Sequence, residues 1–173
     1  MSRSASGAAG SSDRMSRSPE SAGILLHRRR EGVLEVMLVH PGGPLWRNKD
    51  SGAWTIPKGE RAAGEDSETT ARREFAEELG PMPEGQLRPL GRVRQRAGKW
   101  VEAFALEADF DPERLASNSF EIEWPPRSGK RQCFPEIDRA AWFTLDEARR
   151  RINPAQAPFL DALGSSAGSA ENR

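Results

Sequence analysis

Residues 73–80 read REFAEELG and bring three glutamates, Glu74, Glu77 and Glu78, close together in the chain. On an α-helix, residues three and four positions apart are neighbours, and like charges there repel by about 0.2–0.5 kcal/mol per pair. A surface helix gains nothing from this arrangement unless a positive group lies between the carboxylates. The stretch therefore indicates a helix that presents a site for a cation.

The helix itself is expected over residues 67–79, with Asp66 or Ser67 as its N-cap and Gly80 as its C-terminal stop. On a helical wheel, the three glutamates fall within about 100° of one another. A separate apolar stripe lies roughly 120° away and consists of Ala71, Phe75 and Leu79. One face can thus pack on a sheet while another presents the carboxylates.

Hard divalent cations match a carboxylate cluster of this kind. Mg²⁺ takes oxygen ligands, keeps several of its waters, and is commonly shared between a few carboxylates and the phosphates of a substrate. We therefore expect Mg²⁺ at the three glutamates, with Mn²⁺ as a substitute. The competing interpretation is a surface helix in which Arg72 and Arg73 pair with the acids.

The composition describes a polar, soluble chain with one domain. Its 173 residues are enough for a single core, and 30% of them are charged. The net charge is zero, so we expect no affinity for duplex nucleic acid. The sequence has no apolar run long enough to span a membrane and no secretory signal at its start. Its single cysteine, Cys133, excludes an internal disulfide and favours a cytoplasmic setting.

Two segments of low complexity flank the expected domain. Residues 1–20 and 164–173 are rich in Ser, Ala and Gly and cannot bury enough apolar surface to fold, so we expect disordered tails there and an ordered domain over residues 21–163. Within it, short apolar runs predict strands, in order GILLHRR, LEVMLVH, AWTIPKG, LRPLGRVRQRA, KWVEAFALEA, FEIEW and RAAWFTL. A last helix pair follows, at TLDEARRRI and over residues 155–163. The pattern predicts a mixed α/β domain whose sheet is covered by helices.

Upstream residues extend the glutamate stretch into a longer motif. Five residues separate Gly59 from Glu65, and seven more separate Glu65 from the start of REFAEELG at Arg73. This spacing resembles the Nudix box, G-x5-E-x7-R-E-U-x-E-E-x-G-U, in which U is a bulky apolar residue. Only the last position departs, because Pro81 stands there. The resemblance implies an α/β/α sandwich around a mixed sheet, and the hydrolysis of a nucleoside diphosphate linked to another group.

The same resemblance implies roles for individual residues. The metal ligands would be Glu74, Glu77 and Glu78, together with the carbonyl of Lys58. Arg73 would orient the carboxylates, and Glu65 would brace the loop before the helix. These are supporting contacts of the kind that hold metal ligands in place.

A further acid is expected at the metal from outside the box. Glu136 lies six residues before Trp142, and many Nudix enzymes have a metal ligand or base at this offset. Glu102 is the alternative for this role. The base that takes a proton from the attacking water is either Glu74 or Glu136, and the sequence does not choose between them.

The segments around the box resemble several Nudix groups without fixing a substrate. WTIPKG resembles the entry to the box in diadenosine-polyphosphate and diphosphoinositol-polyphosphate hydrolases, while the chain from about 22 to 163 is most similar to a bacterial group of predicted NTP pyrophosphohydrolases. We expect a nucleoside polyphosphate, either an NTP or a dinucleoside polyphosphate. The alternatives are a diphosphoinositol polyphosphate, an RNA 5′ end, and a sensor that binds nucleotides without cleaving them.

Candidate substrate contacts lie in three places. Lys58 is a candidate for a phosphate, and Trp46 for stacking on a base; Trp54 is a candidate for either a base or the core. Basic residues that would clamp a polyphosphate, or simply face solvent, are Arg94, Arg96, Lys99, Arg127, Lys130 and Arg131.

Overall fold

The computed structural model describes residues 20–170, and a hairpin at the centre of one sheet begins the fold. Strands β1 (Glu20–Arg30) and β2 (Val33–Pro41) pair antiparallel around Glu31 and Gly32. These two residues have φ values of 52° and 78°, in the left-handed region that tight hairpin turns require. The strands predicted at GILLHRR and LEVMLVH are confirmed and form the two arms of this hairpin.

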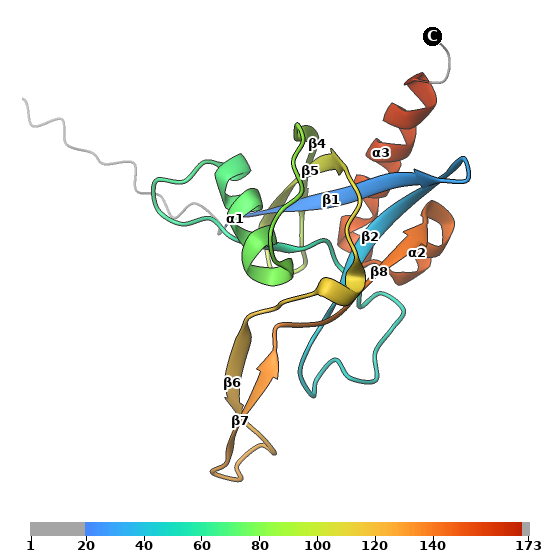
Figure 1. Ribbon diagram of the computed structural model, residues 1–173. Helices are drawn as coiled ribbons and strands as arrows, with labels where there is room; N and C mark the ends of the chain where they lie inside the picture. Colours follow the sequence, from blue (N-terminus) through green and yellow to red (C-terminus); the bar gives the residue numbers. More distant parts are fainter. Residues whose placement is uncertain (1–19, 171–173) are drawn as a thin grey trace, which may run out of the picture.

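The main sheet is mixed and has six strands in the order β4-β5-β1-β2-β8, with β3 paired to β1 (Figure 1). Only the β1–β5 pair is parallel. The added strands are β3 (Lys58–Glu60), β4 (Arg88–Arg94), β5 (Trp100–Glu107) and β8 (Ile137–Thr144). Residues 54–55 add single bridges to Val39 and Ile152, so the segment AWTIPKG reaches the sheet before β3 begins.

Helices cover both faces of this sheet, as the alternation of the strands requires. On one face, Ile24 and Leu26 of β1 pack with Phe75 and Leu79 of helix α1 (Ser67–Leu79). On the other face, Leu25 packs with a second cluster contributed by the C-terminal helices, which includes Ala148, Phe159, Leu160 and Leu163. The α/β/α sandwich is therefore confirmed.

The helix ends follow ordinary capping chemistry. Asp66 caps α1 by accepting a hydrogen bond from the amide of Thr69 at 2.7 Å, and Gly80 ends the helix. Thr144 caps α2 (Leu145–Arg151) in the same way. None of the helices in the described part of the chain has the length and apolar character needed to span a bilayer.

The chain's ends differ in part from the expected tails. Residues 1–19 lie outside the described part of the chain, and Glu20 already belongs to β1. The short helical turn η2 (Pro154–Gln156) leads into α3 (Ala157–Ala170), which continues past the expected boundary at residue 163. Just beyond that boundary α3 still packs against α2, where Gly164 faces the side chain of Leu145.

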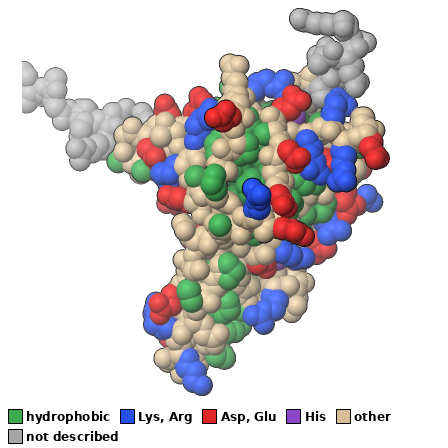
Figure 2. All heavy atoms as spheres, in the orientation of Figure 1, with side chains coloured by type: hydrophobic (Ala, Val, Ile, Leu, Met, Phe, Trp, Pro, Cys, Tyr) green, Lys and Arg blue, Asp and Glu red, His purple; other side chains and the backbone are tan. Residues whose placement is uncertain are grey.

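A second, two-stranded sheet projects from the body of the molecule (Figures 1 and 2). It follows the turn η1 (Pro112–Arg114) and consists of β6 (Ser119–Glu123) and β7 (Arg131–Pro135). The sequence predicted β6 but not β7, because RQCFP lacks the alternation of apolar and polar residues that marks a strand. Its pairing partner, rather than its own pattern, makes it a strand.

Replacing Phe75 by alanine should lower the free energy of unfolding by about 3–5 kcal/mol, because Phe75 is fully buried between α1 and the sheet. Urea denaturation followed by circular dichroism measures this. Val33→Ala is the control, since Val33 is 49% exposed on β2 and should cost less than about 0.5 kcal/mol. Equal costs for the two variants would contradict the assignment of α1 to the core.

Candidate functional site

The site is built where α1 crosses β3. The backbone of Gly59 runs so close to the carboxylate of Glu74 that a Cβ on residue 59 would overlap it. The amide of Lys58 donates to Oε2 of Glu78 at 3.2 Å. Two of the three box glutamates thus point from α1 toward one short stretch of β3, and the glycine is needed for close approach rather than for its φ.

Arg73 lies at the centre of a network of carboxylates. Its guanidinium donates to both oxygens of Glu65 at 2.8 and 2.9 Å, and to Glu74 at 2.9 Å. Further contacts reach Glu77 at 3.2 Å and the carbonyl of Glu60 at 3.1 Å. Because this one cation is shared among three acids, it fixes their positions without neutralising all of their charge. The predicted orienting contacts of Arg73 are present.

Glu65 braces the turn that leads into α1. Besides its two bonds from Arg73, it accepts from the amide of Ala62 at 2.9 Å and from the hydroxyl of Thr70 at 3.3 Å. The Arg73 bonds, helped by the amide of Ala62, lower the pKa of Glu65 to about 2. Glu65 is therefore a fixed anion that ties the loop to the helix.

Glu78 is the most perturbed acid of the cluster. Burial, together with the nearby charges of Glu74 and Glu136, raises the pKa of Glu78 to about 8. Burial also raises the pKa of Glu74, in spite of the hydrogen bond from Arg73 and with added repulsion from Glu77 and Glu136. The region holds more negative charge than Arg73 compensates.

Glu136 joins this cluster from a distant part of the sequence. It is the single residue between β7 and β8, and its charge raises the pKa of both Glu74 and Glu78. Backbone bonds hold it on both sides, from its amide to the carbonyl of Asn118 at 2.8 Å and from the amide of Gly42 to its carbonyl at 2.9 Å. Glu102, the alternative, lies on β5 opposite Arg92 of β4.

The acids suit a hard cation in chemistry and in charge, although they are not drawn together in ligand geometry. Within residues 20–170, no three or more acidic, His or Cys side chains converge as a metal cage would. Arg73 holds Glu74 and Glu77 through hydrogen bonds that a cation would compete for. The mutually repelling carboxylate oxygens of the partly buried Glu74 and Glu78 and of the exposed Glu136 are the donor type that Mg²⁺ prefers, so the residues fit such an ion.

Lys58 and Lys99 supply positive charge beside the acids. Burial lowers the pKa of Lys58, and the neighbouring Lys99 lowers it further. Lys99 itself forms an ion pair with Glu60 at 2.7 Å. Both cations thus lie at the β3 side of the cluster, where a phosphate approaching the acids would meet them.

The other basic candidates are divided by the fold. Arg94 stacks over Trp100, at 5.8 Å from the ring centre, on the β4–β5 edge. Arg131 pairs with Glu121 within the projecting hairpin, and Arg127 and Lys130 lie in the turn between β6 and β7. Space-filling atoms show Lys and Arg side chains at the free end of this projection (Figure 2), roughly 17 Å of strand away from Glu136. The structure does not bring these basic residues together with Lys99 as one clamp.

The two tryptophan candidates lie in different environments. Trp54 is only 3% exposed, and its indole N–H donates to Asp50 at 2.7 Å. It therefore belongs to the core, which was one of the two roles predicted for it. Trp46 is 38% exposed on the loop after β2, next to Leu45, which is 64% exposed. Lys49 lies over the Trp46 ring at 5.0 Å. Trp46 therefore keeps an accessible aromatic surface.

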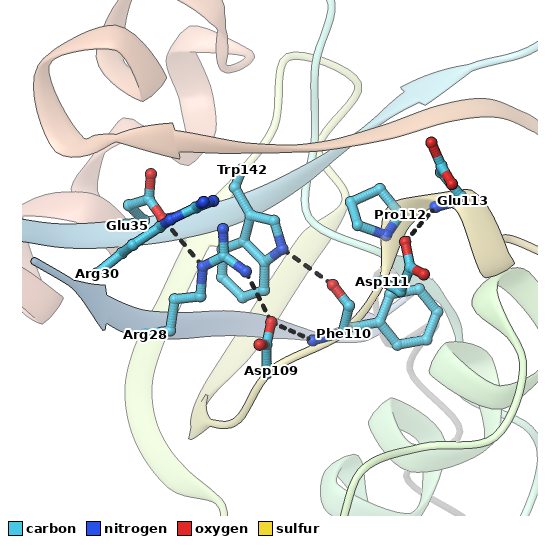
Figure 3. Close-up of a pocket in the computed structure, with 9 residues that line it drawn as sticks. All are labelled: Arg28, Arg30, Glu35, Asp109, Phe110, Asp111, Pro112, Glu113 and Trp142. Carbon is cyan, nitrogen blue, oxygen red and sulfur yellow. Dashed lines mark hydrogen bonds and ion pairs between the residues drawn. The ribbon is translucent and has the colours of Figure 1, made fainter.

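A hollow of about 810 Å³ opens at the C-terminal end of β1, away from the glutamates of the Nudix box (Figure 3). Arg28 lies there over the ring of Trp142, 4.1 Å from its centre. Its guanidinium is bound by Glu35 at 2.9 Å and by Asp109 at 2.7 Å. These contacts join β1, β2 and β8 to the turn before η1, so the polar groups of this hollow serve the fold.

Comparison with known proteins agrees with this architecture and this motif. The family model of the NUDIX domain matches residues 17–163. An RNA pyrophosphohydrolase of Caulobacter vibrioides is 29% identical over 160 residues, which cover 79% of this chain and 83% of the relative. Among solved structures, a C. elegans Ap4A hydrolase complex superposes with a TM-score of 0.62 at 20% identity, covering 86% of this chain and 98% of the other. The NUDIX domain of Shewanella oneidensis NrtR, bound to ADP ribose, gives 0.61 at 14% identity, covering 87% and 89%.

Gly59→Ala should destabilise the fold by about 1–3 kcal/mol, since the added methyl group displaces the Glu74 carboxylate from the backbone of β3. The urea midpoint measures the loss. Gly164→Ala is the matched control, because a Cβ at residue 164 meets only an ordinary contact with Leu145 inside α3. An unchanged midpoint for Gly59→Ala would show that Glu74 does not lie against that backbone.

Glu78→Gln should stabilise the metal-free protein at alkaline pH only. The pKa of Glu78 is 4.5 as a free side chain and about 8 in the fold, so stability is lost as the pH rises through that window and the folded carboxyl ionises. Gln has no such loss. In EDTA, the melting temperature of Glu78→Gln should exceed that of the wild type by a few degrees at about pH 9 and converge with it at about pH 4.

The control for this comparison is Glu121→Gln, which removes an exposed carboxylate from the β6–β7 hairpin. Its melting temperature should follow the wild type at every pH, because exposed ion pairs contribute little. A stabilisation by Glu78→Gln that is the same at both pH values would contradict a buried, proton-binding carboxyl.

Proposed function

This chain belongs to the Nudix family, and on that premise we propose that it is a Mg²⁺-dependent pyrophosphohydrolase that cleaves a phosphoanhydride bond in a nucleoside polyphosphate. The observation that carries the proposal is the group of carboxylates at Glu74, Glu78 and Glu136, in which burial, and after it mutual repulsion, raises the pKa of the partly buried Glu74 and Glu78. A fold held together by ordinary ion pairs gains nothing from such repulsion. A site that admits a cation does.

The proposed metal ligands are Glu74, Glu77 and Glu78, the carbonyl of Lys58, and Glu136. When bound there, Mg²⁺ supplies charge neutralisation for the phosphates and a lower pKa for an attacking water. Arg73 orients Glu74 and Glu77 through its hydrogen bonds, and Glu65 fixes Arg73. Lys58 and Lys99 attract the phosphates to the same side of the cluster.

We assign the base to Glu136 rather than to Glu74. The carboxylate of Glu74 is packed against Gly59 and accepts a hydrogen bond from Arg73, so both its position and its lone pairs are engaged. The backbone of Glu136 is held at the junction of β7 and β8, and its charge raises the pKa of Glu74 and Glu78. This proximity supports Glu136 as the group that would accept a proton from a water beside those acids.

The nucleoside is proposed to stack on Trp46. Its ring is accessible, and its loop begins at Gly42, whose amide is bonded to the carbonyl of Glu136. An aromatic face of this kind stabilises a stacked base by about 1–3 kcal/mol. An NTP or a dinucleoside polyphosphate, the substrate named for the Ap4A hydrolase neighbour, satisfies both the base and the phosphate contacts.

An RNA 5′ end is the second candidate substrate. It is favoured by the similarity to the Caulobacter vibrioides RNA pyrophosphohydrolase, which spans most of both chains. The basic turn of the β6–β7 hairpin, with Arg127 and Lys130, offers a contact for a longer anionic chain that a mononucleotide would not reach. A cytoplasmic setting, expected from the single cysteine, suits either substrate.

Product analysis by liquid chromatography, with Mg²⁺ and then with EDTA, tests the proposal on a panel of substrates. The panel holds nucleoside triphosphates, dinucleoside polyphosphates, a 5′-triphosphorylated RNA, ADP ribose and a diphosphoinositol polyphosphate. We expect metal-dependent cleavage of a nucleoside polyphosphate. Glu78→Gln should reduce turnover about a thousandfold, and Glu136→Gln by about 10²–10⁴.

Glu123→Gln serves as the control for these variants, because Glu123 lies on β6 in the hairpin. Its turnover of a mononucleotide should equal that of the wild type. Full activity in both Glu78→Gln and Glu136→Gln would overturn the assignment of the acids. Binding of a nucleotide without cleavage of any substrate would move the protein to the class of sensors.

A further inference from the structure

His40 lies in the segment HPGG at the end of β2. Its side chain contacts both the loop that follows β2 and the start of β8. It is fully buried, with its ring packed edge-on against Trp54 at 5.2 Å. Nδ1 lies 2.8 Å from a carboxylate oxygen of Asp138, and Nε2 lies 2.6 Å from the carbonyl oxygen of Lys49. Both partner atoms are hydrogen-bond acceptors, and each ring nitrogen of His40 lies within hydrogen-bond distance of one of them.

A β-bulge brings Asp138 to this histidine. His40 pairs with Arg139 across β2 and β8, but Pro41 pairs with Ile137, so Asp138 is an extra residue on β8. Strict alternation would direct Asp138 to the face opposite Arg139. The bulge re-aims the side chain, because Asp138 meets His40 while Arg139 lies over Trp54 on the same side.

The second partner of His40 belongs to the loop that carries Trp46, here named the Trp46 loop, residues 42–53. This loop is held at its far end by Asp50, which binds the indole of Trp54 and the guanidinium of Arg151. Directly before Asp50, the carbonyl oxygen of Lys49 contacts His40 of β2, and the other ring nitrogen of His40 contacts Asp138 of β8. Trp46 is linked to Lys49 directly, because the amide of Lys49 donates to the carbonyl of Trp46 at 3.0 Å.

The first residue of the Trp46 loop is hydrogen-bonded to the proposed base itself, at the junction of β7 and β8. The amide of Gly42 donates to the carbonyl of Glu136 at 2.9 Å, only two residues before Asp138. His40 therefore stands between two segments that serve different parts of one reaction. One segment presents the aromatic ring, and the other presents Glu136 to the acids of α1.

We propose that His40 is a positioning residue that couples the Trp46 loop to Glu136 through Asp138 and the Lys49 carbonyl. The inference rests on the proposed function for the meaning of its two ends, but the clamp itself stands on hydrogen bonds within the chain. Stacking of a base on Trp46 then favours the arrangement in which Glu136 faces the carboxylates. The substrate's nucleoside, which does not react, thereby contributes to the chemical step.

His40→Gln and Asp138→Ala test this clamp from its two sides. His40 is buried, so its variant carries a risk of misfolding, whereas Asp138 is partly exposed and its truncation leaves the core intact. Asp138→Asn keeps an acceptor for His40 and should behave as the wild type. Asp146→Ala is the matched control, because it removes an exposed aspartate that pairs with Arg149 on α2.

Hydrogen exchange followed by mass spectrometry gives a readout that needs no substrate. In His40→Gln and Asp138→Ala, exchange should be about tenfold faster in residues 42–53 and also in residues 136–144, with α1 unchanged. Faster exchange in the loop alone would overturn the coupling. No change in either segment would overturn the clamp.

Steady-state kinetics on the substrate identified by the panel gives the second readout. Both variants should raise KM and lower kcat, each by about tenfold, and the effect on KM should disappear when Trp46→Ala is also present. A purely structural loss would lower the active fraction and leave KM unchanged, which would overturn the proposal. If the wild type cleaves no substrate, the proposed function fails, while the exchange experiment still decides whether the clamp exists.

Discussion

Unbalanced negative charge beside β3 is the constraint on which the rest of this structure depends. Arg73 is shared among Glu65, Glu74 and Glu77, so one guanidinium holds the helix to the loop before it. Burial and mutual repulsion leave Glu78 with a pKa of about 8. Keeping the ionised Glu78 carboxylate in this environment costs folding free energy. A bound cation would offset that cost by pairing with the carboxylate.

The surrounding elements are arranged to keep these acids close to one another. The backbone of Gly59 admits the Glu74 carboxylate, and the apolar face of α1 fixes the helix on the sheet through Phe75. The junction of β7 and β8 brings Glu136 from 58 residues further along the chain than Glu78. A bulge at Asp138 then ties this junction to the loop that presents Trp46. The cluster of acids and the Trp46 loop are thus both connected to the start of β8.

The local pattern of the sequence was enough for the parts of the site that lie within one segment. The spacing of REFAEELG predicted α1, with Asp66 or Ser67 as its cap, because helical periodicity relates these positions directly. The orienting contacts of Arg73 were expected from the resemblance to the Nudix box. Strand β7 was missed, since its pairing with β6 is not written in its own polar sequence. The clamp at His40 was also beyond reach, because it depends on a one-residue bulge that joins positions 98 residues apart. The exposure of Trp46 and the burial of Trp54 were decided by the loop's anchoring at Asp50 rather than by residue type.

The most direct test of the central claim, that the repelling acids form a cation site, is calorimetric titration of the protein with Mn²⁺. Titration near pH 7.5 in two buffers of different ionisation enthalpy counts the protons released on binding. The account predicts saturable binding with release of about one proton, which comes from Glu78 because its pKa in the free protein is about 8. Glu78→Gln should bind the ion more weakly and release none. Binding by the wild type without proton release, or equal binding by the variant, would contradict the claim.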